Sequence, residues 1–430
     1  MRSKAVSFMA NAHKKLAVVI CSAVLSLAGC VSTTVTQTGP VAVGPGSAMS
    51  SGPKQRTYSY NSNIYLNVAV PVFNPGFPLD KSTGQIDYDE MGEQGIWPQL
   101  RRSEAKRFAI KTKEALEKTK SFSAVSVVPN ANTTADLFVL GTILQSDSET
   151  IELEAMVMDS SGEILGQKTF EHRVSKHFFR DQLNAEKNPY GEVFQQIGDY
   201  VYSLIISLPD AAKNKIKETT LVRYAQYYSP EEFDKYINTS IKRKGGTQYY
   251  KHELVGTPAE QNKMLKRIET LKAQDQLFVD QLQDNYDAFD AETLTAYRTW
   301  QKETLPDAVA RREAEEERNT KAAFGIGLAV MSAVLASNSS SNAGNIATAA
   351  GALGSAKLLI DSFKANEDMK VHSEIIDEQG QGLDLSLSPT VMEFNDKTVE
   401  LTGTASEQYE QWKAHLKSIY DLEATPNRQL

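Results

Sequence analysis

Cysteine is almost absent from this 430-residue chain, which contains only Cys21 and Cys30. Both lie within the first thirty residues, so residues 31–430 carry no thiol at all. Intramolecular disulfides, thiolate catalysis and cysteine-ligated zinc are therefore excluded for the whole of that stretch.

The sequence signatures of catalysis and cofactor binding are missing as well. There is no Gly-x-Ser-x-Gly elbow and no Gly-x-x-x-x-Gly-Lys-Ser/Thr phosphate loop. The six histidines include no His-Glu-x-x-His, and His172 and His177 alone do not make a metal site. We therefore expect no catalytic residue, no cofactor and no metal.

Two weaker patterns have simpler explanations. Asp147, Glu149, Glu152 and Glu154 gather around one expected strand and could in principle act on a glycosidic bond. Exposed strand faces are often charged for solubility, and we prefer that interpretation. The pairs Tyr227-Tyr228 and Tyr249-Tyr250 are interpreted as packing residues rather than as a platform for sugar stacking.

Basic clusters are also lacking. The chain has 46 Lys and Arg against 54 Asp and Glu, giving a formal net charge of −8. An acidic chain of this kind argues against a nucleic-acid partner and against electrostatic docking on anionic lipid.

The amino-terminal end has a distinct pattern. Arg2, Lys4, Lys14 and Lys15 precede an apolar run over 16–27, which is too short for a membrane-spanning helix and typical of a secretion signal. The run ends in Leu27-Ala28-Gly29-Cys30, which resembles the lipobox of bacterial lipoproteins.

That resemblance implies a processing and sorting pathway. A signal peptide, residues 1–29, is removed, the Cys30 thiol takes the lipid, and the formal net charge moves to about −12. Val31 follows the cysteine, where an Asp in this family tends to cause retention at the inner membrane, so we expect the outer membrane. Residues 30–57 are rich in Ser, Thr, Gly and Pro and predict a tether of roughly 30 Å.

Residues 58–208 predict a small α/β domain. A strand at 64–73 and a loop rich in Gly and Pro precede a helix that starts at Trp97-Pro98 and buries Ala105, Phe108, Ala109 and Leu116. Strand patterns follow at 124–128, 137–144, 151–158 and 164–174, and a closing helix runs from 190 to 208.

We summarise this order as βαβββα within an α+β chain. The order resembles the small α/β domains of envelope lipoproteins such as the TolB amino-terminal domain and the curli secretion-pore family. No motif is shared, so the resemblance implies a fold and little about function.

Residues 209–321 predict a helical region. Ser229-Pro-Glu-Glu232 and Thr257-Pro-Ala-Glu260 have the pattern of capping boxes that open helices. Leu305-Pro306 is expected to break the second helix, and the charged run 311–318 is expected to restart it with a solvated face.

Residues 322–362 predict a helical hairpin rich in Gly and Ala. Small residues recur every four positions along both arms, which allows close backbone approach. The packing positions are Gly325, Ala329 and Ala333 in the first arm, and Ala347, Gly351 and Ser355 in the second. Fifteen uncharged residues rise only about 22 Å, short of the bilayer core, so burial in protein is favoured over contact with lipid.

Residues 363–430 return to mixed structure. The pattern predicts a helix through Glu374 and Ile376, then a β-hairpin that turns at Asn395-Asp-Lys397. Thr404-Ala-Ser-Glu407 is a third capping box, and Tyr409, Trp412, Leu416 and Ile419 lie on one face of the helix that it opens.

These features together indicate a non-enzymatic outer-membrane lipoprotein that faces the periplasm. Its expected role is structural, through self-association or through protein partners in an envelope complex such as a secretion, export or appendage machine. The alternative is a periplasmic binding module for peptidoglycan or another envelope ligand. A subunit-burying hairpin would favour the first role, and an aromatic-lined pocket in the α/β domain would favour the second.

Overall fold

The computed structural model of the chain describes residues 57–244, 247–259, 262–323, 360–361 and 363–424. Helices and a mixed sheet alternate along these residues, which confirms the α+β class. The lipidated cysteine, its tether and almost all of the Gly/Ala-rich segment lie outside the described residues.

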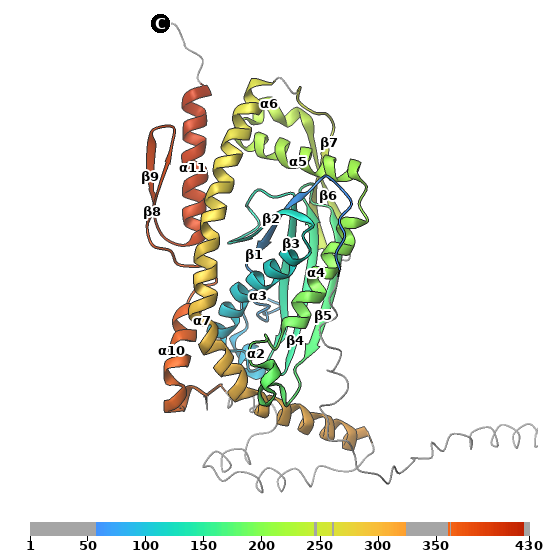
Figure 1. The fold of residues 1–430 in the computed structure, drawn as a ribbon, viewed down its shortest axis with the longest axis vertical. Helices are drawn as coiled ribbons and strands as arrows, with labels where there is room; N and C mark the ends of the chain where they lie inside the picture. Colours follow the sequence, from blue (N-terminus) through green and yellow to red (C-terminus); the bar gives the residue numbers. More distant parts are fainter. Residues whose placement is uncertain (1–56, 245–246, 260–261, 324–359, 362, 425–430) are drawn as a thin grey trace, which may run out of the picture. The chain divides into compact units, whose positions relative to one another are not determined.

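A five-stranded sheet lies at the centre of the fold (Figure 1), in the order β2-β1-β3-β4-β5. β1 is parallel to β2 and to β3, whereas β3, β4 and β5 are antiparallel. The sequence shows four strand patterns after the first helix, and all four join the sheet. The predicted order βαβββα counts only three of them and is therefore one strand short. The strands are β1 (Leu66–Pro71), β2 (Phe122–Val128), β3 (Leu137–Ser146), β4 (Thr150–Asp159) and β5 (Ile164–Arg173).

Two helices, α3 (Pro98–Lys118) and α4 (Gly191–Ile206), pack on each other and on the sheet (Figure 1). α3 begins at Pro98, whose missing N–H would have no intrahelical partner, and its predicted apolar face is buried. A short helix that the sequence did not predict, α2 (Tyr88–Glu93), interrupts the loop before α3. Its first N–H groups are satisfied by the Asp87 carboxylate.

The middle region is less helical than expected. It begins with α5 (Asp210–Tyr228) and the one-turn α6 (Pro230–Phe233). An antiparallel hairpin of β6 (Ile237–Lys244) and β7 (Thr247–Leu254) then precedes the long helix. It docks on the β4–β5 turn, where the His252 amide donates to the Ser161 carbonyl at 2.7 Å. The polar composition of both strands hid this hairpin, because neither strand buries a regular apolar face.

The two capping boxes expected in this region do not form as predicted. The Ser229 hydroxyl makes no cap at α6 and lies 2.5 Å from the Glu231 carboxylate instead. The next helix, α7 (Lys263–Ala323), starts later than Thr257, where the Asn262 side chain accepts from the amides of Met264 and Leu265.

α7 has 61 residues and continues through Pro306, so the expected break is wrong. Pro306 is exposed while Leu305 and Val309 beside it are buried. The carbonyl of Lys302, which loses its helical partner to the proline, therefore lies on the solvent side, and packing on the other side holds the helix together. Figure 1 shows the last turns of α7 angled away from its long first part, as a proline kink would produce.

The carboxyl-terminal predictions are confirmed. Helix α10 (Lys370–Gln379) packs on α3 and α7, and β8 (Thr390–Phe394) pairs with β9 (Lys397–Leu401). Asn395 and Asp396 both have positive φ, as a two-residue hairpin turn requires. α11 (Ala405–Ala424) begins with a formed capping box, because the Thr404 amide donates to the Glu407 carboxylate at 2.8 Å and the Glu407 amide reaches the Thr404 hydroxyl at 3.4 Å.

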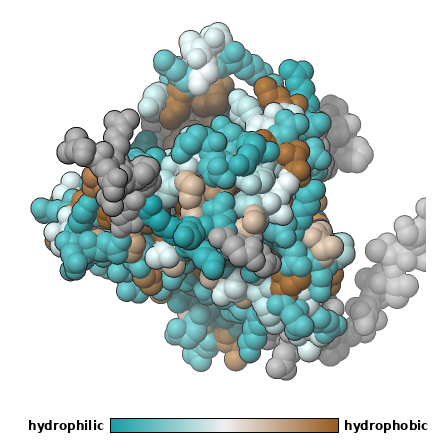
Figure 2. All heavy atoms as spheres, turned by 90° about the horizontal axis from the view of Figure 1, so that it is seen from above, coloured by the Kyte–Doolittle hydropathy of each residue, from teal (hydrophilic) through white to brown (hydrophobic). Residues whose placement is uncertain are grey.

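One continuous apolar core joins the sheet, α7 and the carboxyl-terminal helices, from Leu66 to Tyr420. On the face seen from above, apolar side chains lie scattered among hydrophilic ones (Figure 2). Within the described ranges, no helix combines the length and the apolar character needed to cross a membrane. Single turns of 3-10 helix complete the described elements: Phe178–Arg180, Gln182–Asn184, Asp234–Tyr236 and Glu367–Met369.

Candidate functional site

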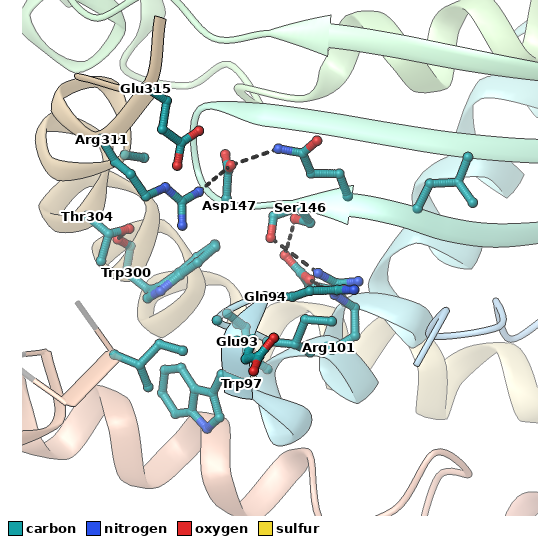
Figure 3. Close-up of a pocket in the computed structure, with 18 residues that line it drawn as sticks. Glu93, Gln94, Trp97, Arg101, Ser146, Asp147, Trp300, Thr304, Arg311 and Glu315 are labelled. Atoms are coloured by element: carbon teal, nitrogen blue, oxygen red, sulfur yellow. Dashed lines mark hydrogen bonds and ion pairs between the residues drawn. The ribbon is translucent and has the colours of Figure 1, made fainter. Parts of the chain in front are cut away.

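A cleft of about 340 Å³ opens where the end of β3, the start of α3 and the last part of α7 meet. Figure 3 shows side chains from all three elements converging on it. Ile360, just before the carboxyl-terminal region, also lines the cleft. This is the lower end of the sheet in Figure 1, the end that carries the β3–β4 turn.

A buried carboxyl group, Glu104 of α3, lines the cleft and is only 1% exposed. Its Oε1 accepts from the Ser146 hydroxyl at 2.6 Å and from the Tyr297 hydroxyl at 2.9 Å. Its Oε2 lies 3.4 Å from Nε of Arg101 and has no hydrogen-bond partner among the described residues. Burial raises the pKa of Glu104, and the positive charge of Arg101 opposes that rise.

Arg101 is itself committed to the protein. Its guanidinium donates to the carbonyl of Pro75 at 3.3 Å and to that of Ser146 at 3.4 Å, in addition to its pairing with Glu104. The side chain therefore ties the start of α3 to the end of β3.

The rim of the cleft is held by ion pairs between the β3–β4 turn and α7. Arg311 contacts Asp147 at 2.9 Å, and Arg312 contacts both carboxylate oxygens of Glu149 at 2.9 and 3.0 Å (Figure 3 shows the first pair). The charged run of α7 is thus only partly solvated, which corrects the expectation from the sequence. Two of the four acidic residues singled out around β4 are its partners.

Glu93 and Glu315 are two further carboxylates of the cleft. No ion pair or side-chain hydrogen bond joins either one to another part of the described chain. Glu93 lies at the end of α2 and is exposed, and Glu315 lies on α7 and is half-buried. Among the described side chains, none neutralises these two carboxylates.

Two tryptophans form part of the walls. The Trp97 indole N–H donates to Asp377 at 2.9 Å, and the Lys364 ammonium lies 4.3 Å from its ring centroid. Trp300 stacks on Tyr297 with ring centroids 5.5 Å apart. Both tryptophans are at most 5% exposed, so little of either ring is accessible from the cleft.

The sequence did not single out this group of residues. Trp97 was interpreted only as the start of a helix, and no role was predicted for Arg101 or Glu104. The one local signal is the spacing of Arg101 and Glu104, which places them on the same side of α3. Ser146 and Tyr297 come from segments far away in the chain, so only the tertiary fold brings the cluster together.

The sites that the sequence did predict have mixed outcomes. Cys30 and the six hairpin positions, Gly325, Ala329, Ala333, Ala347, Gly351 and Ser355, lie outside the described residues and stay predictions. His172 is half-buried, and burial lowers its pKa. Over the described ranges no three His, Cys, Asp or Glu side chains are grouped so as to hold a metal ion.

The remaining candidates behave as packing and surface residues. Glu152 and Glu154 are half-buried on the sheet face opposite to Leu153. Tyr228 is buried and lies 3.0 Å from the Tyr224 hydroxyl, as expected for a packing residue. Tyr250 is 63% exposed on β7, so the packing interpretation does not hold for that residue.

Comparison with known proteins adds no assignment. No protein-family model matches the chain, and no curated protein and no solved structure matches it either.

Proposed function

We propose that this chain is a lipoprotein, anchored at Cys30 in the outer membrane and facing the periplasm, that acts as a non-enzymatic structural component of an envelope complex. Self-association or assembly with a secretion, export or appendage machine is the proposed activity. The similarity of the α/β segment to the TolB amino-terminal and curli secretion-pore lipoproteins belongs to the same proposal.

The observation that carries the proposal is how the described body is connected. α7 contacts β2, α3, α5, α10 and α11 along its length (Figure 1). A single helix therefore packs against the sheet, the helices before it and the carboxyl-terminal helices. One helix thus connects the sheet to the carboxyl-terminal helices in a single packed body, as suits an assembly component.

The described residues adjoin the tether and the Gly/Ala-rich segment at different elements of the fold. The described chain begins against α4, where the Tyr58 hydroxyl donates to the Asp199 carboxylate at 2.7 Å and the Tyr202 hydroxyl donates to the Ser59 carbonyl at 2.7 Å. The neighbours of segment 324–359, Ala323 and Ile360, belong to the end of α7 and to the cleft at the end of β3.

The test is the mass of the full-length protein extracted in mild detergent from its own membrane. We expect a discrete particle larger than one processed chain, either a homo-oligomer or a complex with defined protein subunits. Fractionation of the same cells should place it in the outer membrane. A monodisperse monomer without co-purifying protein would contradict the assembly role.

The second candidate is a binding module for peptidoglycan or another envelope ligand, and the cleft is the observation in its favour. At about 340 Å³ the cleft is large enough for a small ligand, and its walls combine two tryptophans with polar groups. Co-sedimentation with purified peptidoglycan tests this candidate. Binding that a cleft variant such as Gln94→Lys removes would support it, and absence of binding would count against it.

A further inference from the structure

We propose that the β6–β7 hairpin of one copy of this chain packs on the β8–β9 hairpin of a second copy. The contact joins a basic surface to an acidic one, and each surface also carries exposed apolar side chains. Because the two surfaces differ, every copy offers both, and the contact repeats along a ring or a row of copies. The inference rests on the self-association part of the proposed function and names the surfaces that meet.

The β6–β7 hairpin has an exposed apolar pair beside a cation. Ile241 and Tyr250 lie directly opposite each other on the two strands and are 56% and 63% exposed. Arg243 is exposed on the same face, because residues two apart on a strand point the same way. It donates to the Gln248 side chain at 3.4 Å. No described acidic side chain forms an ion pair with Arg243 or with the exposed Lys242 beside it.

The β8–β9 hairpin has the complementary character. It lies beside α11 (Figure 1), and its inner face buries Met392 and Leu401. Its outer face carries Val391, which is 67% exposed, opposite the exposed Glu400. Glu393, two residues after Val391, is exposed on the same face. Among the described residues, no cation forms an ion pair with either glutamate.

The charges of the two hairpins select each other as partners. Residues 237–254 contain four Lys and Arg against one Glu, although the whole chain has a net charge of −8. Residues 390–401 contain three Asp and Glu against one Lys. Contact between two identical hairpins would bring like charges together, whereas the mixed contact pairs opposite charges and covers the apolar side chains of both faces. No hydrogen bond or ion pair joins the two hairpins within the described chain, so the contact forms between copies.

The size of the surfaces sets the strength of the contact. β6 has eight residues and β8 has five, so the strands are roughly 26 and 17 Å long. A contact of that size is weak between freely diffusing molecules. Anchoring every copy in one membrane raises their effective concentration and strengthens the association. We therefore expect the contact on a membrane rather than in dilute solution.

Cysteine cross-linking of the lipidated protein in phosphatidylcholine vesicles tests the proposal. Residues 31–430 contain no thiol, so an introduced cysteine reacts alone once Cys30 carries its lipid. An affinity-tagged Ile241→Cys variant is mixed with an untagged Val391→Cys variant and mildly oxidised. We expect a disulfide-linked dimer that contains one chain of each kind, and no dimer from either variant alone. Leu277→Cys, at a position 51% exposed on α7, is the matched control and should not cross-link to Val391→Cys.

Charge reversal then tests the pairing of opposite signs. Lys242→Glu with Arg243→Glu, introduced on the chain with the β6 cysteine, should reduce the cross-linked fraction by about fivefold. Glu393→Lys with Glu400→Lys, introduced on the chain with the β8 cysteine, should do the same. Mixing the two reversed chains should restore the cross-link, because the signs are again opposite. All four positions are exposed, and restoration cannot come from chains that fail to fold.

The outcomes separate this inference from the proposed function. A mixed cross-link that charge reversal weakens and double reversal restores supports the contact between the two hairpins. Cross-links only between identical variants, only to the control cysteine, or none at all would overturn it. A discrete particle larger than one processed chain, extracted from native membranes without any mixed cross-link, would leave the assembly role standing and remove only this contact. A monomer in both experiments would remove both.

Discussion

The side-chain amide of Gln283 on α7 pairs with the backbone of Val127 on the edge strand β2, accepting from its N–H at 2.9 Å and donating to its carbonyl at 2.9 Å. The amide thus occupies the place that a further strand would take. Edge strands with free N–H and C=O groups are sites of unwanted pairing, and here one side chain satisfies part of that edge.

The first prediction follows from this contact. Gln283→Glu keeps an acceptor but replaces the donor with a carboxylate oxygen facing the Val127 carbonyl, so the free energy of unfolding should fall by about 1–3 kcal/mol. Urea denaturation measures the change. Gln281→Glu, at an exposed position one half-turn away on α7, should be nearly neutral. Equal stability of the two variants would show that the pairing contributes nothing.

The second prediction concerns Asp275, a polar interruption of the apolar pattern on α7 that is buried beside the Tyr409 hydroxyl at 3.1 Å. Burial raises the pKa of Asp275 to about 6 from the ordinary 3.8, so the folded state holds a proton that the unfolded chain releases. Stability should therefore fall as the pH rises from about 4 to about 6, by roughly 3 kcal/mol from this group.

Asp275→Asn isolates that contribution. The variant should lose this part of the pH dependence and gain stability relative to the native protein as the pH passes 6. Thermal unfolding of both proteins across the range from pH 4 to pH 8 measures the difference. Parallel curves for the two proteins would mean that Asp275 stays ionised in the folded state.

The third prediction concerns Gly380, which follows α10 where it meets α3. A Cβ built there would lie 2.0 Å from the carbonyl oxygen of Gln99, and backbone cannot move aside cheaply. Gly380→Ala should destabilise the packing of the carboxyl-terminal region by about 1–3 kcal/mol. Gly382→Ala is the matched control, because its nearest neighbour would be the Asp384 carbonyl oxygen at 3.4 Å. Limited proteolysis should release carboxyl-terminal fragments from the first variant and leave the second intact.

The fourth prediction tests the anchor. Acylation requires the Cys30 thiol, so Cys30→Ser should remain at its unprocessed mass and carry no fatty acid. Metabolic labelling with palmitate and mass spectrometry report both properties. Label in the variant would rule out the lipobox interpretation.

The fifth prediction tests the small-residue stripes of the Gly/Ala-rich hairpin. Leucine at Ala329 or Gly351 should overpack a close helix contact, at a cost of about 1–3 kcal/mol, while the described body, with its own core, stays folded. Size-exclusion mass and proteolysis of the lipid-free protein are the measurements, with Glu316→Leu as the exposed control. Loss of an oligomer indicates subunit contact, and destabilisation of a monomer indicates packing within the chain. Behaviour like that of the native protein would exclude both and favour lipid contact.

Segments with strong local patterns were predicted well from the sequence. The start of α3 at Pro98, the β8–β9 turn at Asn395 and the capping box at Thr404 all formed as expected. In each case a few neighbouring residues settle the backbone, through a fixed φ, a tolerated positive φ or a reciprocal hydrogen bond. Nothing distant is needed to specify them.

Other features required contacts across the fold. β6 and β7 have polar sequences, and their hairpin is docked by Ser161 of the β4–β5 turn. Pro306 fails to end α7 because buried neighbours hold the helix on its inner side. No local pattern predicts that Arg101 and Glu104 are buried, yet Glu104 accepts hydrogen bonds from Tyr297 of α7 and from Ser146 of β3.

The sequence by itself determined the class of the fold, most of its elements and the expectation of a lipid anchor, because those depend on composition and on residues close together in the chain. The cleft was decided only by tertiary structure. Glu104, Ser146 and Tyr297 belong to three elements that the sheet order and the path of α7 bring together. Burial then changes the chemistry of a carboxyl group that, in a sequence, looks like any other surface glutamate.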